Sequence, residues 1–195
     1  MTTSTKEKIL REAQRLIHTN GFRTTSVDAI AKAAGVKKAN VFYYFPNKEA
    51  LGLELLDRMA TNLIDRVLAP YFATDRHPTE QIRDNIQGIR TNLEAFNCQG
   101  GCPLGNMALE MADVDEAFRT RLTHFFEAWE SVIEGVLKRG LETGVYRETM
   151  DPRATASFIV SALEGAILLA KTKRDPEVLA HAESHLMHLL EGYQV

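Results

Sequence analysis

"TTSVDAIAKAAGVKKANVFYYFPNKEAL", residues 24–51, contains the pattern that decides the fold. Apolar residues recur at helical spacing on both sides of Gly35, and Pro46 ends the second of these segments, because the residue before a proline is disfavoured in helical geometry. The stretch therefore predicts two short helices, one ended by Gly35 and the other beginning near Lys37. Two short helices joined by a tight turn that contains glycine form a helix-turn-helix, whose second helix lies in the major groove of DNA.

Four aromatic residues in succession, FYYF, are the second feature of this stretch. A core strand is one explanation, and a helix that turns one face to the core and another to a partner is a second. On a helix, Val41, Phe42 and Phe45 are expected to pack against the preceding helices. Tyr43 and Tyr44 then turn outward, where their hydroxyl groups can donate to phosphates. A three-helix domain is too small to bury all four rings, which favours the second explanation.

Charge is unevenly distributed along the chain of 195 residues, whose net charge is −3. Residues 1–50 hold nine Lys or Arg against four Asp or Glu, a net charge of +5, whereas the remainder carries −8. A basic head on an acidic body indicates an anionic partner for the head, although uneven surface charge also arises by chance. Two cysteines are too few for a disulfide scaffold and favour a reducing compartment.

Outward from this stretch, cap residues followed by apolar periodicity predict an all-α fold of about nine helices. Residues 1–47 are expected to form a DNA-binding helix-turn-helix domain, and residues 48–195 a larger helical regulatory domain. The longest apolar segment, residues 154–170, is interrupted by polar residues and is expected to be a buried helix and not a membrane span. The expected helix starts are Ser4 as a capping residue, Thr25 with Asp28, Lys37 or Lys38, Asn47, Thr79, Cys102-Pro103, a segment before Phe118, Asp151-Pro152 and Asp175-Pro176.

Residues 24–51 strongly resemble the DNA-reading unit of the TetR family of bacterial transcriptional repressors. The resemblance is dense over residues 6–56 and looser beyond. It implies a cytoplasmic homodimer that binds a palindromic operator and releases it when a small molecule or an electrophile acts on the C-terminal domain. The release is expected to follow a tilt of the helix that begins at Lys48, which changes the separation of the two DNA heads.

The resemblance also implies roles for individual residues at the front of the chain. Asn40 is placed to read adenine and Ala39 to touch a thymine methyl group, with Lys38 beside them. Lys37 stands where family members often carry a serine cap; lysine cannot accept a hydrogen bond, so we expect it to contact the DNA backbone and to leave the cap to water. Positions that match phosphate contacts of the family are Thr25, Tyr43, Tyr44 and Lys48.

The last two expected helices are rich in apolar and small residues, which predicts that a second chain covers them. Gly165 and Ala166 would allow a neighbouring helix to approach closely. A monomeric core is the alternative, but a reader of palindromes needs a partner chain. The residues expected at the dimer interface are Phe158, Ala162, Gly165, Ala166, Leu186 and Leu190.

The stretch "CQGGCPLGNMALEM", residues 98–111, contains both cysteines. Cys102 precedes an expected helix, whose unpaired N–H groups and positive end would lower the pKa of the thiol and make it reactive. Some TetR-like repressors with a glycine-cysteine pair at this point respond to electrophiles or small organic acids, so the resemblance favours a sensor. A buried and inert thiol is the alternative. A disulfide between Cys98 and Cys102 is not predicted, and neither is zinc.

A non-covalent ligand is the competing trigger for release. Methionine and aromatic side chains suit adaptable apolar pockets, although each of these residues also fits an ordinary core. Candidates for the lining are Met59, Leu63, Met107, Met111, Phe125 and Trp129, with Lys171 among the polar groups that would orient the ligand. We find no motif of an enzyme and expect no cofactor. A helical protein that only binds other proteins would not need the basic head.

Overall fold

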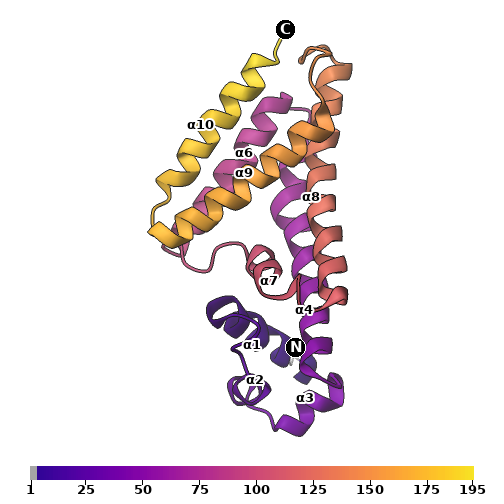
Figure 1. Ribbon diagram of the computed structural model, residues 1–195, viewed down its shortest axis with the longest axis vertical. Coiled ribbons are helices and arrows are strands. Elements are labelled where there is room, and N and C mark those ends of the chain that lie inside the picture. Colours follow the sequence, from indigo (N-terminus) through magenta and orange to yellow (C-terminus); the bar gives the residue numbers. More distant parts are fainter. Residues whose placement is uncertain (1–3) are drawn as a thin grey trace. The chain divides into compact units, whose positions relative to one another are not determined.

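The computed structural model describes residues 4–195, and this part of the chain is helical throughout, with short connections (Figure 1). The helices are α1 (Thr5–Asn20), α2 (Val27–Ala34), α3 (Lys38–Tyr44), α4 (Lys48–Asn62), the π-helix η1 (Leu63–Leu68), α5 (Ala69–Phe72), α6 (Pro78–Ala95), α7 (Pro103–Met111), α8 (Glu116–Glu142), α9 (Pro152–Lys173) and α10 (Glu177–Gly192). Because α4, η1 and α5 follow one another without a break, residues 4–195 contain nine continuous helical segments, which confirms the predicted all-α class. The same residues contain no strand, and their one β-bridge is an isolated antiparallel pair, Tyr146 with Gln194.

The chain divides into two compact units. Unit 1 comprises the described residues up to Ala60 together with Pro103–Thr123, and unit 2 comprises Thr61–Cys102 together with His124–Val195. Unit 1 therefore includes α7 and the start of α8 in addition to the first helices. The predicted functional division between residues 47 and 48 follows the sequence pattern and not this division by contacts, and it stays a prediction.

Local capping bonds fix the helix starts of unit 1. The Ser4 hydroxyl accepts from the backbone N–H of Glu7 at 3.2 Å, as the sequence predicts for the start of α1. The second helix is capped one residue later than predicted: Ser26, not Thr25, accepts from the N–H of Ala29 at 3.1 Å. The core of unit 1 contains apolar side chains from the first three helices and from α4 that are almost fully buried, namely Ile9, Leu10, Ala13, Ile30, Val41, Phe45, Leu51 and Leu55.

Unit 2 is built around α10, which packs against both α6 and α9, and Figure 1 shows α9 and α10 side by side. Tyr146 is buried, and its hydroxyl lies 2.8 Å from the hydroxyl of Thr79 at the start of α6. Asp151 caps α9 through the N–H groups of Arg153 and Ala154, both at 3.0 Å, as its sequence predicts. Among residues 4–195, α9 alone is long and apolar enough to cross a membrane by length and composition, a test that the core helix of a soluble protein also passes.

Candidate nucleic-acid interface and sensor residues

Helix α3 divides its side chains between the core of unit 1 and solvent. Val41 and Phe45, four residues apart, are each 1% exposed and face α1 and α2. Tyr43 is 81% exposed and Tyr44 is 37% exposed, and their rings meet edge to face with centroids 5.0 Å apart. The predicted inward position of Phe42 is wrong. Its ring is 42% exposed, because residue 42 lies about 100° around the helix from Val41 and only positions 41 and 45 share the inner face.

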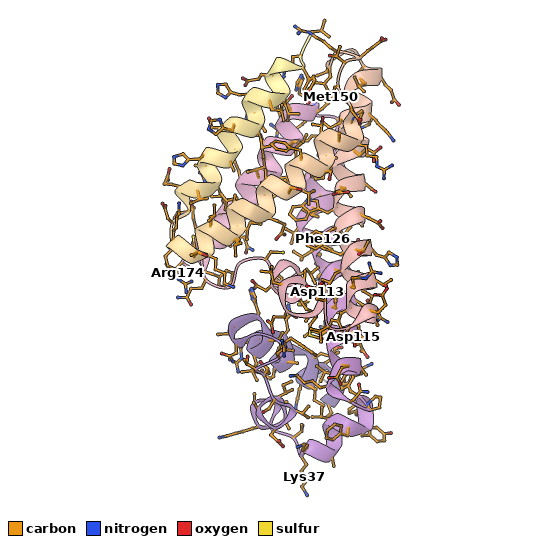
Figure 2. All side chains as sticks on the ribbon, viewed as in Figure 1. Lys37, Asp113, Asp115, Phe126, Met150 and Arg174 are labelled. Atoms are coloured by element: carbon orange, nitrogen blue, oxygen red, sulfur yellow. The ribbon has the colours of Figure 1, made fainter. Side chains whose placement is uncertain are left out.

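The N-terminal end of α3 carries Lys38, Ala39 and Asn40, which were expected to meet base edges, and Lys37, which was expected to contact the DNA backbone. Lys37, Lys38, Ala39 and Asn40 are all exposed, and Lys37 points away from unit 1 into solvent (Figure 2). The Lys37 side chain makes no capping bond, as predicted, but the cap is not left to water alone. The amide oxygen Oδ1 of Asn40 accepts from the backbone N–H of Lys37 at 3.2 Å, which completes half of a capping box.

Lys38 is held by neighbours within the head. Its Nζ lies 2.8 Å from Oδ2 of Asp28 on α2 and 6.0 Å from the centroid of the Phe42 ring. Both charged groups of this ion pair are at least half exposed, so the pair contributes little to stability and DNA phosphates can compete for the lysine.

Two residues expected to contact phosphate are engaged in the loop between α1 and α2. Thr25 is 3% exposed, and its hydroxyl donates to the Gly21 carbonyl at 2.7 Å. We therefore assign the Thr25 side chain to the fold of the loop and not to the candidate interface. Lys48 donates from Nζ to the Arg23 carbonyl at 3.1 Å and lies 4.7 Å from the centroid of the Phe22 ring. Partial burial lowers the pKa of this ammonium, and the charges of Glu49 and Glu110 oppose the effect.

The sequence did not identify the residue that completes this loop. Glu110, on α7, accepts hydrogen bonds from the backbone N–H groups of Phe22 at 3.1 Å and Arg23 at 2.9 Å. It lies 88 residues from Phe22 in the chain, so no local pattern connects the two positions. A single glutamate on a short amphipathic helix has no distinguishing sequence signal of its own.

Both cysteines are free thiols, Cys98 buried and Cys102 half-buried. Burial is the main cause that raises the pKa of Cys98, and the charges of Glu94 and Asp175 add to it. Asn97 and Cys98 have positive φ angles of 50° and 54°, and Gly100 and Gly101 follow with 86° and 69°. The connection before α7 therefore contains two pairs of left-handed residues separated by Gln99, and only the glycine pair adopts this conformation at no steric cost.

Cys102 lies beside the carboxyl group of Glu164, a residue that was not predicted to belong to the sensor. Its thiol is hydrogen-bonded to Glu164 of α9, whose pKa is raised by burial and lowered to a smaller extent by this bond. Oxygen Oε1 of Glu164 is buried and has no hydrogen-bond partner. Lys171, two turns further along α9, packs its Cδ atom 2.9 Å from the position that a Cβ would take at Gly101. The structure thus brings the predicted sensor residues Cys102 and Lys171 to the same connection.

The residues expected to line a ligand cavity are divided between the two units. Met59, Met107 and Met111 are buried in unit 1, whereas Phe125 and Trp129 are buried in unit 2 and Leu63 is half-buried there. The indole Nε1 of Trp129 has no hydrogen-bond partner. Unit 2 also has a hollow of about 390 Å³, whose lining includes none of these residues: it is formed by Glu94, Asn97, Cys98, Gln99, Arg174 and Pro176. Arg174 stands at the end of α9 (Figure 2).

Metal binding finds no support in the part of the chain that the structure describes. Residues 4–195 contain no group of three or more His, Cys, Asp or Glu side chains that could hold a metal ion.

Comparisons with known proteins match both halves of the chain to one family. Residues 9–55 match the family of bacterial regulatory proteins called the tetR family, and residues 78–185 match the C-terminal domain of LmrA/YxaF-like transcriptional regulators. The chain belongs to the TetR family. Members of this family are DNA-binding transcriptional regulators and not enzymes, and the predicted family membership is confirmed.

Individual relatives can be aligned with nearly the whole of this TetR-family chain. The transcriptional regulator LmrA of Bacillus subtilis is 30% identical over 95% of this chain and 96% of its own length. The transcriptional repressor DhaR of a Mycobacterium species is 26% identical over 91% of this chain and 87% of its own. The crystal structure of a regulatory TetR protein from Rhodobacter sphaeroides superposes with a TM-score of 0.88 at 26% identity and covers 95% of this chain and 98% of that one.

The residues expected at the dimer interface of this TetR-family chain fall into two groups. Ala166, Leu186 and Leu190 are between 0% and 5% exposed within the single chain, so contacts inside unit 2 already account for their burial. Phe158 is 57% exposed, Gly165 is exposed and Ala162 is half-buried. Leu168 and Leu169, which the sequence did not single out for this role, are each 46% exposed on the same helix.

Proposed function

We propose that this TetR-family chain is a transcriptional repressor that binds a palindromic operator as a homodimer in the cytoplasm and is released by a small molecule or an electrophile. The observation that carries the proposal is the outer face of α3. This helix buries only Val41 among its own residues and presents Lys37, Ala39 and Asn40 at its start and two tyrosines at its end. A short helix with amide, ammonium and phenol groups on one exposed face suits base edges and phosphates together.

Each DNA-facing residue has a proposed role. Asn40 reads a base through its amide, Ala39 contacts a thymine methyl group and Lys38 lies beside them at the base edges, whereas Lys37, Tyr43 and Tyr44 contact the backbone. Lys48 acts indirectly, because its ammonium is bound to the Arg23 carbonyl and supports the loop before α2.

The test is a selection of double-stranded DNA from a random library at two salt concentrations. We expect enrichment of a palindrome with two half-sites, and binding that weakens as salt rises. Asn40→Ala should relax preference at one base pair by about 1–3 kcal/mol, whereas Lys37→Ala should weaken binding to every sequence alike. A wild-type protein that enriches no duplex refutes the proposal.

The proposed dimer joins two copies through α9. Phe158, Gly165 and Leu169 are spaced seven and four residues apart, so they lie on one face of that helix, and Leu168 adjoins them. These apolar side chains are exposed in the single chain, and a second copy would cover them. The buried residues Ala166, Leu186 and Leu190 then shape the face from below and do not touch the partner.

Two alternative triggers are proposed in unit 2, a covalent one at the connection before α7 and a non-covalent one at Trp129 of α8. Cys102 can add to an electrophile, and the hydrogen bond from its thiol to Glu164 offers a path for the proton. Trp129 has an unpaired indole N–H that a non-covalent ligand in unit 2 could satisfy. Release of the selected DNA by a panel of electrophiles and small acids, compared with Cys102→Ser, separates the two triggers. A full response in Cys102→Ser excludes the thiol.

A further inference from the structure

One carboxylate holds the loop that leads into the helix-turn-helix. Oε1 of Glu110 accepts from the N–H of Phe22 at 3.1 Å and Oε2 accepts from the N–H of Arg23 at 2.9 Å. These two residues follow directly after α1 and Gly21, where backbone N–H groups have no partner in a helix. Hydrogen bonds to a charged acceptor are stronger than neutral ones, and both oxygens of the carboxylate are used here.

The loop is shaped to receive this carboxylate. Gly21 has a φ of 90°, and a Cβ on it would lie 2.7 Å from Oε1 of Glu110, so a larger residue would push the carboxylate away. The opposite edge of the loop is fixed by the bond from Lys48 to the Arg23 carbonyl. The Phe22 ring is 2% exposed and packs on Phe118 with ring centroids 5.1 Å apart. This segment is therefore held at four points: the N–H groups of Phe22 and Arg23, the Arg23 carbonyl and the Phe22 ring.

The two partners of this contact come from different halves of the family pattern. Phe22 and Arg23 lie within residues 9–55, which match the bacterial regulatory proteins of the tetR family, whereas Glu110 lies within residues 78–185, which match the C-terminal domain of LmrA/YxaF-like regulators. All of them belong to unit 1. Three residues beyond Arg23, Ser26 caps α2, and α2 packs against α3. The position of the loop therefore affects where the recognition helix starts.

We propose that Glu110 is the positioning residue through which the C-terminal part of the chain holds the α1–α2 loop, and with it α3, in the arrangement that binds DNA. The inference rests on the proposed function, since DNA affinity is the property that Glu110 controls. Loss of the carboxylate frees two backbone N–H groups, and the head then populates arrangements in which α3 is displaced.

The experiment compares Glu110→Ala and Glu110→Gln with Asp113→Asn, which removes an exposed negative charge just beyond α7 (Figure 2). Amide hydrogen exchange at Phe22 and Arg23 reports on the contact, and the Kd for the DNA selected by the wild-type protein reports on its consequence. We expect Glu110→Ala to accelerate exchange at both amides and to raise Kd, each by at least about tenfold, because the variant loses two charge-assisted hydrogen bonds and the loss of one alone corresponds to about that factor. Glu110→Gln keeps one acceptor oxygen, so its exchange rates and Kd should lie between those of the wild type and Glu110→Ala. Asp113→Asn should have the exchange rates and Kd of the wild type.

A reciprocal measurement distinguishes the proposed role of Glu110 in DNA binding from a role in the fold alone. If the held loop belongs to the DNA-binding arrangement, DNA must in turn slow exchange at Phe22 and Arg23 in the wild type, because the coupling works in both directions. The proposal is overturned if DNA leaves these two amides unchanged, or if Glu110→Ala accelerates their exchange and keeps the wild-type Kd. A wild-type protein that selects no duplex refutes the proposed function itself, which is a different result from a normal Kd in Glu110→Ala.

Discussion

The substitution Gly165→Ala tests whether a second copy of the chain covers the exposed face of α9. In the single chain a Cβ at Gly165 would meet no atom within 4 Å. Alanine in an open helix interior is more favourable than glycine by roughly 0.5–1 kcal/mol. Gly135 of α8 offers a matched control, because the nearest atom to its added Cβ is Nη1 of Arg139 at 3.9 Å.

A partner helix on this face changes the expected result. The gain in helix propensity is present in the monomer and in the dimer, so it cancels from the dimer dissociation constant. An extra methyl group in a close helix contact costs about 1–3 kcal/mol, which corresponds to a rise in Kd of at least about fivefold. We therefore expect Gly165→Ala to raise the Kd of the dimer and Gly135→Ala to leave it unchanged while it raises Tm.

Sedimentation equilibrium over a range of protein concentrations gives the dimer Kd, and thermal unfolding gives Tm. The reasoning is refuted if Gly165→Ala leaves Kd unchanged and raises Tm as Gly135→Ala does. In that case the face around Gly165 is open in solution, and any dimer forms through another surface.

Three further substitutions test separate parts of the structure. Gly52→Ala should lower the free energy of unfolding by about 1–3 kcal/mol in a urea titration, because its Cβ would overlap the Phe22 ring and lie 2.8 Å from the Phe118 ring; a more stable variant contradicts this packing. Glu164→Gln should have a higher Tm than the wild type at pH 7 and the same Tm as the wild type at pH 4. Burial raises the pKa of Glu164, so the stability provided by its proton is complete below the ordinary value of about 4.3 and is lost as pH rises through the folded pKa; an equal difference at both pH values contradicts the assignment. Lys37→Ala should reduce the slope of log K against log salt by about one, and an unchanged slope shows that Lys37 contacts no phosphate.

Helix starts were predictable because their signals are local. Ser4, Asn47 and Asp151 each accept a hydrogen bond from an N–H two or three residues ahead, so a short window of sequence contains both partners. The cap of α2 shows the limit of this logic. Thr25 and Ser26 are adjacent hydroxyl residues, and burial of Thr25 against the loop, which depends on tertiary packing, decides that Ser26 is the cap.

Long-range contacts account for most of what the sequence did not predict. Lys48 was expected to face phosphate, but its ammonium is directed to the Arg23 carbonyl and the Phe22 ring. The loop that Lys48 contacts is also bound by Glu110, which accepts from the N–H of Arg23 and lies 87 residues from it in the chain. Neither residue type signals such a contact by itself. The functional proposal for the loop therefore depends on the structure, whereas the proposal for α3 was accessible from its pattern.

A local irregularity in the long helix that begins at Lys48 also has a physical cause that the sequence contains. Pro70 has no N–H to donate to the Arg66 carbonyl, and its ring would crowd that carbonyl in a regular α-helix. The wider turns of η1, Leu63–Leu68, stand directly before it and include Arg66. The helix therefore continues to Phe72, with a π-helical segment where the proline interrupts the regular bonding pattern.

Asn40 has two roles: it caps the start of α3, and it is the residue proposed to read a base. Its Oδ1 accepts from the Lys37 N–H at 3.2 Å, so the amide is already oriented in the absence of DNA. Lys37 in place of a serine removes the reciprocal side-chain bond, and Asn40 provides the side-chain bond that remains at this end of α3. Reading adenine requires the same oxygen to accept from the base while Nδ2 donates to it, and a carbonyl oxygen has two lone pairs for the two donors. Loss of Asn40 would then weaken the start of α3 on every DNA sequence as well as relax preference at one base pair, so its effect on affinity should exceed its effect on specificity.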